Sequence, residues 1–115
     1  MPTWKPEEMP APAAASVHLK RGTIHFPREL CDEYFPGIGA VALLERDGDV
    51  LIVPLAGNSA GGLLLKLRNA RGDRVLHAQE FLRGHGFRED FEDRPCVVRW
   101  DDAMHALVLT GLPFL

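Results

Sequence analysis

Residues 40–55 read AVALLERDGDVLIVPL, in which two apolar runs flank Asp47-Gly48-Asp49. An Asp-Gly pair between two such runs is a strong signal for a β-hairpin, because glycine adopts a positive φ without a steric penalty. The flanking runs also contain the β-branched residues that are common in strands. The sequence therefore predicts two strands, residues 40–46 and 50–55, joined by a tight turn.

The segment before this hairpin predicts an interrupted strand followed by a short helix. Apolar and polar residues alternate over residues 17–26, as in a half-buried strand, and Arg21-Gly22 interrupts the pattern. Pro27 suits the first turn of a helix, because its fixed φ is already helical and its missing N–H costs nothing there. We therefore expect a helix over residues 27–34.

The second part of the chain repeats this order of elements after a glycine-rich linker at residues 56–62. The matching letters are Arg21-Gly22 with Arg71-Gly72, Ile24 with Val75, and Val41 with Val97. The expected elements are a strand at 63–67, a turn at 69–73, a strand at 74–77, a helix at 78–83, and a hairpin with strands at 96–100 and 106–110. The chain is therefore interpreted as two similar halves.

Neither half is large enough to form a core alone, because an isolated hairpin is only marginally stable in water. Two halves can bury their apolar faces against each other around a pseudo-twofold axis, and an intertwined barrel leaves few open strand edges. We therefore predict a mainly β protein with short helices, folded as a pseudo-twofold, swapped-hairpin-like barrel. One domain is expected at residues 16–115, with half-repeats at 16–57 and 62–112, after a flexible Pro/Ala-rich tail at residues 1–15.

Lys20-Arg21-Gly22 precedes an apolar-x-apolar-Pro segment that ends at Pro27, and a short helix and a hairpin follow. In this order and spacing, residues 17–55 resemble the AbrB/SpoVT family of swapped-hairpin transcription factors. Two copies in one chain look like the MraZ arrangement, in which tandem halves replace a dimer of single halves. The second half departs from the family pattern, since Ala78 stands at the position of Pro27.

The resemblance implies a small DNA-binding transcriptional regulator, in which basic residues around the first strand and turn of each half contact double-stranded DNA. The matching residues are Lys20, Arg21, Arg28, Lys66, Arg68, Arg71 and Arg74. Residues 66–74 place four cations within nine residues, and only Asp73 opposes them. Such a patch would neutralise phosphates, and its affinity would fall steeply with salt. The alternative is an ordinary solvated β-turn with surface arginines.

The charge of the whole chain favours a second hypothesis, a non-enzymatic protein-interaction or accessory module on the same fold. The formal net charge is −3 and the pI is about 5.9, whereas nucleic-acid-binding domains are usually basic. The docking surface would then be the apolar end, Leu112-Pro113-Phe114-Leu115, or the tail with Trp4. Under either hypothesis the protein is expected as a monomeric pseudo-dimer or a homodimer.

The sequence carries no signature of an enzyme, so we expect no catalytic residues. The glycine-rich stretch 57–62 lacks the lysine of a P-loop, and neither a nucleophile elbow nor a dinucleotide fingerprint is present. His25 and His77, taken with Cys31 or Cys96, lack the tight spacing of a metal site. We therefore also expect no metal and no cofactor.

The two cysteines have no partner at C-x-x-C spacing, which is typical of reduced, intracellular thiols. No apolar run reaches the roughly 18 residues that a membrane span requires. Residues 1–16 also lack the apolar stretch of a signal peptide. We therefore expect a cytoplasmic protein without membrane contact.

Overall fold

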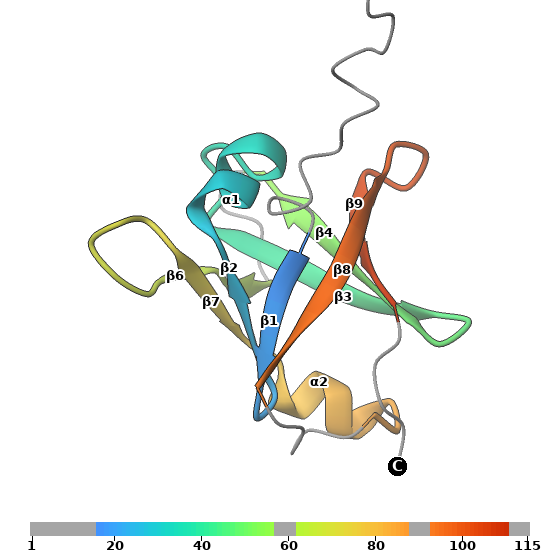
Figure 1. Ribbon diagram of the computed structural model, residues 1–115. Coiled ribbons are helices and arrows are strands. Elements are labelled where there is room, and N and C mark those ends of the chain that lie inside the picture. The colour runs from blue at the N-terminus through green and yellow to red at the C-terminus, as the bar shows by residue number, and fades with distance from the viewer. Residues whose placement is uncertain (1–15, 57–61, 88–92, 111–115) are drawn as a thin grey trace, which may run out of the picture.

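The computed structural model describes residues 16–56, 62–87 and 93–110, which form nine strands and two short helices (Figure 1). The first half contributes β1 (Ser16–Lys20), β2 (Thr23–Phe26), α1 (Arg28–Tyr34), β3 (Ala40–Arg46) and β4 (Asp49–Leu55). The second half contributes β5 (Leu63–Leu64), β6 (Lys66–Leu67), β7 (Arg74–His77), α2 (Gln79–Gly84), β8 (Arg94–Asp101) and β9 (Ala106–Leu109). The predicted fold class, mainly β with short helices, is confirmed. Neither helix of the described residues is long and apolar enough to cross a membrane.

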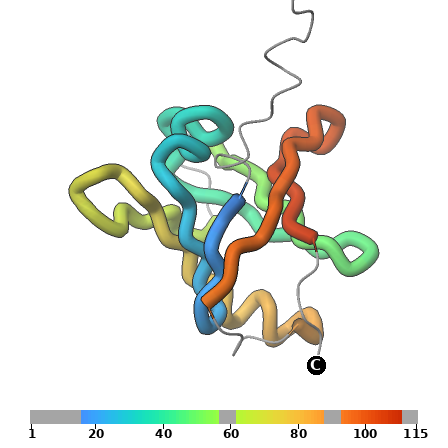
Figure 2. The backbone as a smooth tube through the Cα atoms, in the orientation of Figure 1, coloured from blue at the N-terminus to red at the C-terminus, as the bar shows by residue number. Residues whose placement is uncertain are grey.

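The described strands form one antiparallel sheet in the order β5-β3-β4-β9-β8-β1-β2-β7-β6. The edge strands β5 and β6 are consecutive in the chain and are separated by Leu65 alone. Leu65 is buried, and its N–H donates to the carbonyl oxygen of Gly39 over 2.9 Å. The chain itself thus links the two edges, and the sheet curls into a nearly closed barrel (Figure 2). The single strand predicted over residues 63–67 is therefore wrong, because the chain changes neighbours at Leu65.

The strand pairings show an exchange between the two halves. β1 pairs with β8, and β5 pairs with β3, so the first strand of each half lies beside the hairpin of the other half. β2 pairs with β7 and β4 pairs with β9, which relates the halves by a pseudo-twofold axis through these two strand pairs. The halves are therefore intertwined, as the swapped-hairpin prediction requires.

The core lies inside the barrel, and a helix covers each of its two ends (Figure 1). α1 buries Leu30 and Cys31 at one end, and α2 buries Leu82 at the other. The strands fill the interior with side chains that are at most 1% exposed, including Leu19, Ile24, Phe26, Ile52, Leu76 and Leu107. Because each such side chain contributes about 1.5–3 kcal/mol when it is fully buried, this interior is the main source of stability.

The pattern of buried residues shows that the sequence alignment of the two halves is displaced by one residue. Val41 is fully buried, but its letter match Val97 is 71% exposed, and Val98 occupies the core position instead. Likewise, fully buried Ile24 pairs with fully buried Leu76. Successive strand residues face opposite sides of a sheet, so a slip of one residue exchanges the core and solvent faces. The structural counterparts are Val41 with Val98 and Ile24 with Leu76, and not Val97 and Val75.

The turn and helix predicted for the first half are confirmed. Asp47 and Gly48 have φ values of +55° and +87°, and β3 and β4 pair from Arg46–Asp49 to Ala40–Leu55. Two positive φ values in a two-residue loop match the right-handed twist of the flanking strands. α1 begins directly after Pro27, which serves as its N-cap residue.

Candidate nucleic-acid interface

The outer face of β1 and β2 carries a row of polar side chains. His18 pairs with His25, and Lys20 pairs with Thr23 at the next outward position. These residues alternate with buried leucine and isoleucine, so their side chains share the face that points away from the core.

A groove of about 360 Å³ follows this face, and we call it the basic groove. Its polar lining is His18, Lys20, His25, Arg68, Asp73 and Asp93, with Ser16 at the start of β1. Apolar contacts come from the barrel end, where Phe26 and Pro27 lead into α1, and from Pro95 of β8. Strands of both halves therefore build the groove, and the β6–β7 turn borders it.

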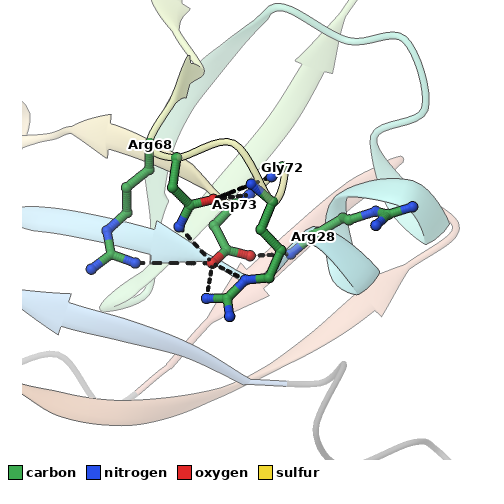
Figure 3. A network of polar contacts seen from close by, with 6 residues as sticks. Arg28, Arg68, Gly72 and Asp73 are labelled. Atoms are coloured by element: carbon green, nitrogen blue, oxygen red, sulfur yellow. Dashed lines mark hydrogen bonds and ion pairs between the residues drawn. The ribbon is translucent and has the colours of Figure 1, made fainter.

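Asp73 organises the β6–β7 turn beside this groove (Figure 3). Although it is charged, Asp73 is only 7% exposed. Its Oδ1 accepts the backbone N–H of Arg28 at 3.0 Å, and its Oδ2 accepts Asn69 Nδ2 at 3.0 Å and Arg71 Nη2 at 2.6 Å. Arg68 Nη1 lies 4.0 Å from the same Oδ2. The hydrogen bond from Asn69, followed by that from Arg71, lowers the pKa of Asp73 to about 2.

The backbone of this turn folds around the side chain of Asn69. Asn69 Oδ1 accepts the N–H groups of Arg71, Gly72 and Asp73 at 3.0, 3.2 and 3.2 Å. Gly72 has a φ of +106°, and a Cβ there would lie 3.1 Å from Cδ of Arg28. Glycine is therefore required where the turn lies against the first residue of α1.

His25 lies in the basic groove with one ring nitrogen bound and the other free. The hydroxyl of Thr23 donates its only proton to the carbonyl oxygen of Lys20, so it must accept a proton from His25 Nε2, which is 2.9 Å away. The neutral ring therefore carries its proton on Nε2, and the buried Nδ1 has no partner among the described residues. Burial, followed by the positive charge of Arg68, lowers the pKa of His25. His18 and Lys20 act in the same direction, and Asp93 opposes them.

The seven basic residues expected at the interface do not all lie together in the structure. Four of them border the basic groove or the Asp73 turn: Lys20, Arg28, Arg68 and Arg71. Arg21 lies in the β1–β2 turn, where its carbonyl oxygen accepts Gln79 Nε2 of α2 at 3.4 Å. Lys66 is exposed on β6 outside the groove lining. Arg74 is half-buried away from the groove, and its Nη1 donates to the carbonyl oxygen of Leu65 at 3.3 Å.

Sequence reasoning missed three groove residues, His18, His25 and Asp93. His18 Nδ1 lies 2.8 Å from Asp93 Oδ1, so β1 and the start of β8 are tied together at the surface. The sequence does contain a signal for the two histidines, because polar and apolar residues alternate around them as they do around Lys20. The contact with Asp93 has none, because it depends on a strand pairing between the two halves.

The histidines and cysteines do not assemble a metal site in the part of the chain that the structure describes. No three His, Cys, Asp or Glu side chains gather there as metal ligands. Cys31 packs in the core, and burial raises the pKa of its thiol to about 11. Its thiol is therefore a small apolar group at neutral pH.

Comparison with protein-family models, curated proteins and solved structures finds no match to this chain. The resemblance to the AbrB/SpoVT family therefore rests on residues 17–55 and on the order of the elements.

Proposed function

We propose that this protein binds the phosphate backbone of double-stranded DNA through the basic groove, as a small cytoplasmic transcriptional regulator of the AbrB-like type. The observation that supports this most is the gathering of Lys20, Arg68 and His18 around His25, close enough to lower its pKa. The chain has a net charge of −3, and Asp73 and Asp93 also line the groove, so the positive charge is confined to the Lys20 and Arg68 side chains and their surroundings. Phosphates that bind there release counterions, which favours association at low salt.

The arginines beside Asp73 keep donors free for a phosphate. A guanidinium group has five N–H donors in a fixed fork. Arg71 directs its Nε and Nη2 to Asp73, and Arg68 approaches Asp73 through Nη1. The side chains of Arg68 and Arg71 are 48% and 72% exposed, so their remaining N–H groups face solvent. Asp73 thus positions two guanidinium groups at the edge of the groove.

Titration into random double-stranded DNA at increasing salt tests the proposal. For three or four phosphate contacts, we expect the logarithm of the affinity to fall against the logarithm of salt with a slope of about −3. Lys20→Gln and Arg68→Gln should each weaken binding and reduce that slope by about 1. Absence of binding at low salt excludes the proposal.

Arg46→Gln is the matched control for these variants. Arg46 is exposed at the end of β3, which three other strands separate from β1 in the sheet. It carries the same charge, so its loss changes the net charge equally but leaves the basic groove intact. An equal loss of affinity in Arg46→Gln would show that net charge, and not the groove, governs binding.

The position of His25 in the basic groove adds a pH dependence to the proposal. A phosphate bound in the groove stabilises the protonated ring, because its negative charge offsets the positive charges of Arg68 and Lys20 that lower the pKa of His25. The pKa of free His25 lies below its ordinary value of 6.5, so binding takes up a proton and the affinity should rise as the pH falls below about 7. His25→Gln should lose most of this rise, whereas His77→Gln, at an exposed position on β7, should keep it. The same pH profile in His25→Gln and the unchanged protein would contradict this role.

The alternative, a protein-interaction module, places its surface on residues 112–115 or on the tail with Trp4. Both segments lie outside the described residues. The DNA titration separates the two hypotheses, because a protein-interaction module without a phosphate site does not bind random DNA even at low salt.

A further inference from the structure

A second groove, of about 490 Å³, shares no lining residue with the basic groove. It lies where α1 meets the β8–β9 hairpin, and these two elements occupy the same end of the barrel (Figure 1). Its main lining residues are Tyr34, Pro36, Ile38, Pro54, Trp100 and His105. We call it the aromatic groove, because its centre is built from rings.

Two rings in this groove are held in fixed positions. Tyr34 of α1 and Trp100 of β8 stack with their ring centroids 5.2 Å apart and their planes inclined by 12°. The rings of His105 and Trp100 pack in a T-shaped arrangement with their centroids 5.0 Å apart. Trp100 Nε1 donates to Asp102 Oδ1 at 2.8 Å. Both Tyr34 and Trp100 remain partly exposed. A rigid aromatic surface is therefore available to a ligand.

Rigid aromatic surfaces of this kind bind proline-rich segments. A polyproline II segment is already extended, so it loses little conformational entropy on docking, and its pyrrolidine rings pack flat on tyrosine and tryptophan. The sequence of the chain is rich in proline near its start, because four of its first twelve residues are proline, including Pro10 and Pro12.

The register of β1 places its N-terminal end toward the aromatic groove. Ser16 pairs with Val97, and β1 runs antiparallel to β8, so the N-terminal end of β1 points along β8 toward Trp100. Trp100 is three residues beyond Val97, which is about 10 Å along the strand. Pro12 is four residues before Ser16, a reach of about 12 Å in polyproline II. The lengths therefore match.

We propose that Pro10-Ala11-Pro12 docks in the polyproline II conformation on Tyr34 and Trp100 of its own chain. The docked segment covers the rings and extends the contact between the first half and the β8–β9 hairpin. This inference does not depend on DNA binding, because the two grooves use different residues.

Fluorescence of Trp100 in the full chain tests the docking. The chain has two tryptophans, so Trp4→Phe leaves Trp100 as the only one. In that background, Pro10→Ser/Pro12→Ser should shift the Trp100 emission to longer wavelength and increase its quenching by acrylamide. Pro2→Ser/Pro6→Ser, which removes the same number of prolines farther from Ser16, should change neither. Identical quenching in all three proteins would overturn the proposal.

A dilution series distinguishes docking within one chain from docking between two copies. Docking within one chain predicts that the quenching of Trp100 is independent of protein concentration. If the rings become accessible on dilution, the segment belongs to a second copy, and the proposal for one chain is wrong. Nuclear Overhauser contacts between Pro12 and the Trp100 ring in the dilute protein would support the proposal directly, and contacts of Pro12 with another surface would contradict it.

Discussion

Asp73 is a buried charge, and both of its carboxylate oxygens accept hydrogen bonds from surrounding residues. A buried carboxylate is tolerated only when ion pairs and hydrogen bonds replace its hydration. Here one oxygen accepts the N–H of Arg28, and the other accepts Asn69 and Arg71. Pro27, the N-cap residue of α1, makes no side-chain cap of its own. The second half therefore supplies the cap that the first helix lacks.

The low pKa of Asp73 predicts a specific loss of stability in acid. The pKa is about 2, below its ordinary value of 3.8, so the ionised carboxylate stabilises the folded protein above pH 3.8. That contribution, about 1–2 kcal/mol, is lost as the pH falls through 2. Asp73→Asn should therefore be less stable than the unchanged protein at pH 7 and should approach it near pH 2, as measured by urea unfolding.

Asp32→Asn is the control for this pH dependence. Asp32 pairs with Arg28 at 3.4 Å, but its side chain is 69% exposed, and exposed pairs contribute little. Its difference from the unchanged protein should be small at every pH. If the Asp73→Asn curve runs parallel to that of the unchanged protein down to pH 2, the carboxylate does not have the role assigned to it.

Gly72 provides a test of the close contact between the β6–β7 turn and α1. Gly72→Ala places a Cβ at a φ of +106° and 3.1 Å from Cδ of Arg28, so we expect destabilisation by about 1–2 kcal/mol. Gly39→Ala is the matched control, since no atom lies within 4 Å of its added Cβ. Thermal unfolding gives the melting temperatures of both variants. Equal melting temperatures would show that the turn accommodates the added Cβ without loss of stability.

At the scale of elements, Leu65 decides whether the barrel closes. It separates the edge strands β5 and β6 and is 3% exposed, whereas its neighbour Leu64 is 63% exposed. Leu65→Ala leaves a cavity in the core and should destabilise the protein by about 2–4 kcal/mol. Leu64→Ala should change the stability by less than about 0.5 kcal/mol. Urea unfolding compares the two, and similar losses would mean that closure does not depend on Leu65.

The sequence predicted elements better than their pairing, and the reason is physical. Asp47-Gly48 and Pro27 act through local backbone geometry, so the hairpin and α1 were predicted correctly. Leu65 belongs to an unbroken apolar run. The chain is divided there into β5 and β6 only because β5 pairs with β3, whereas β6 pairs with β7. The letter match of Val41 with Val97 failed for a similar reason, because the face of a strand depends on register with a distant partner.

The candidate site was predicted only where the chemistry is local. Lys20 and Arg68 are recognisable as cations, and both line the basic groove. Asp73 looked like a charge that merely opposes its neighbours, because its partner, the Arg28 N–H, is 45 residues away in the chain. His25 was noted only as a metal-ligand candidate, since the proximity of Arg68 appears only in the folded protein.

At the scale of the whole molecule, the pseudo-twofold symmetry is broken where the basic groove forms. The β1–β2 turn is Arg21-Gly22, whereas the β6–β7 turn is longer and carries Asp73. The groove beside His77, the counterpart of His25, is about 610 Å³, and Glu80 is its only charged lining residue in the described part of the chain. In the described part of the chain, the two similar halves therefore produce two different grooves, and only the one beside His25 is lined by the basic residues Lys20 and Arg68.

The intertwined strands also predict that the halves unfold together. Ile24 of β2 is fully buried opposite Leu76 of β7, so Ile24→Ala should destabilise the protein by about 2–4 kcal/mol. β1 pairs with β8, and β3 pairs with β5, so each half loses strand partners when the other half unfolds. Amide hydrogen exchange in β9, on the far side of the barrel, should therefore accelerate as much as exchange in β7. Val97→Ala, at an exposed position, should accelerate neither. If β9 stays protected while β7 opens in Ile24→Ala, the two halves are separable folding units, and interlocking is not what stabilises the barrel.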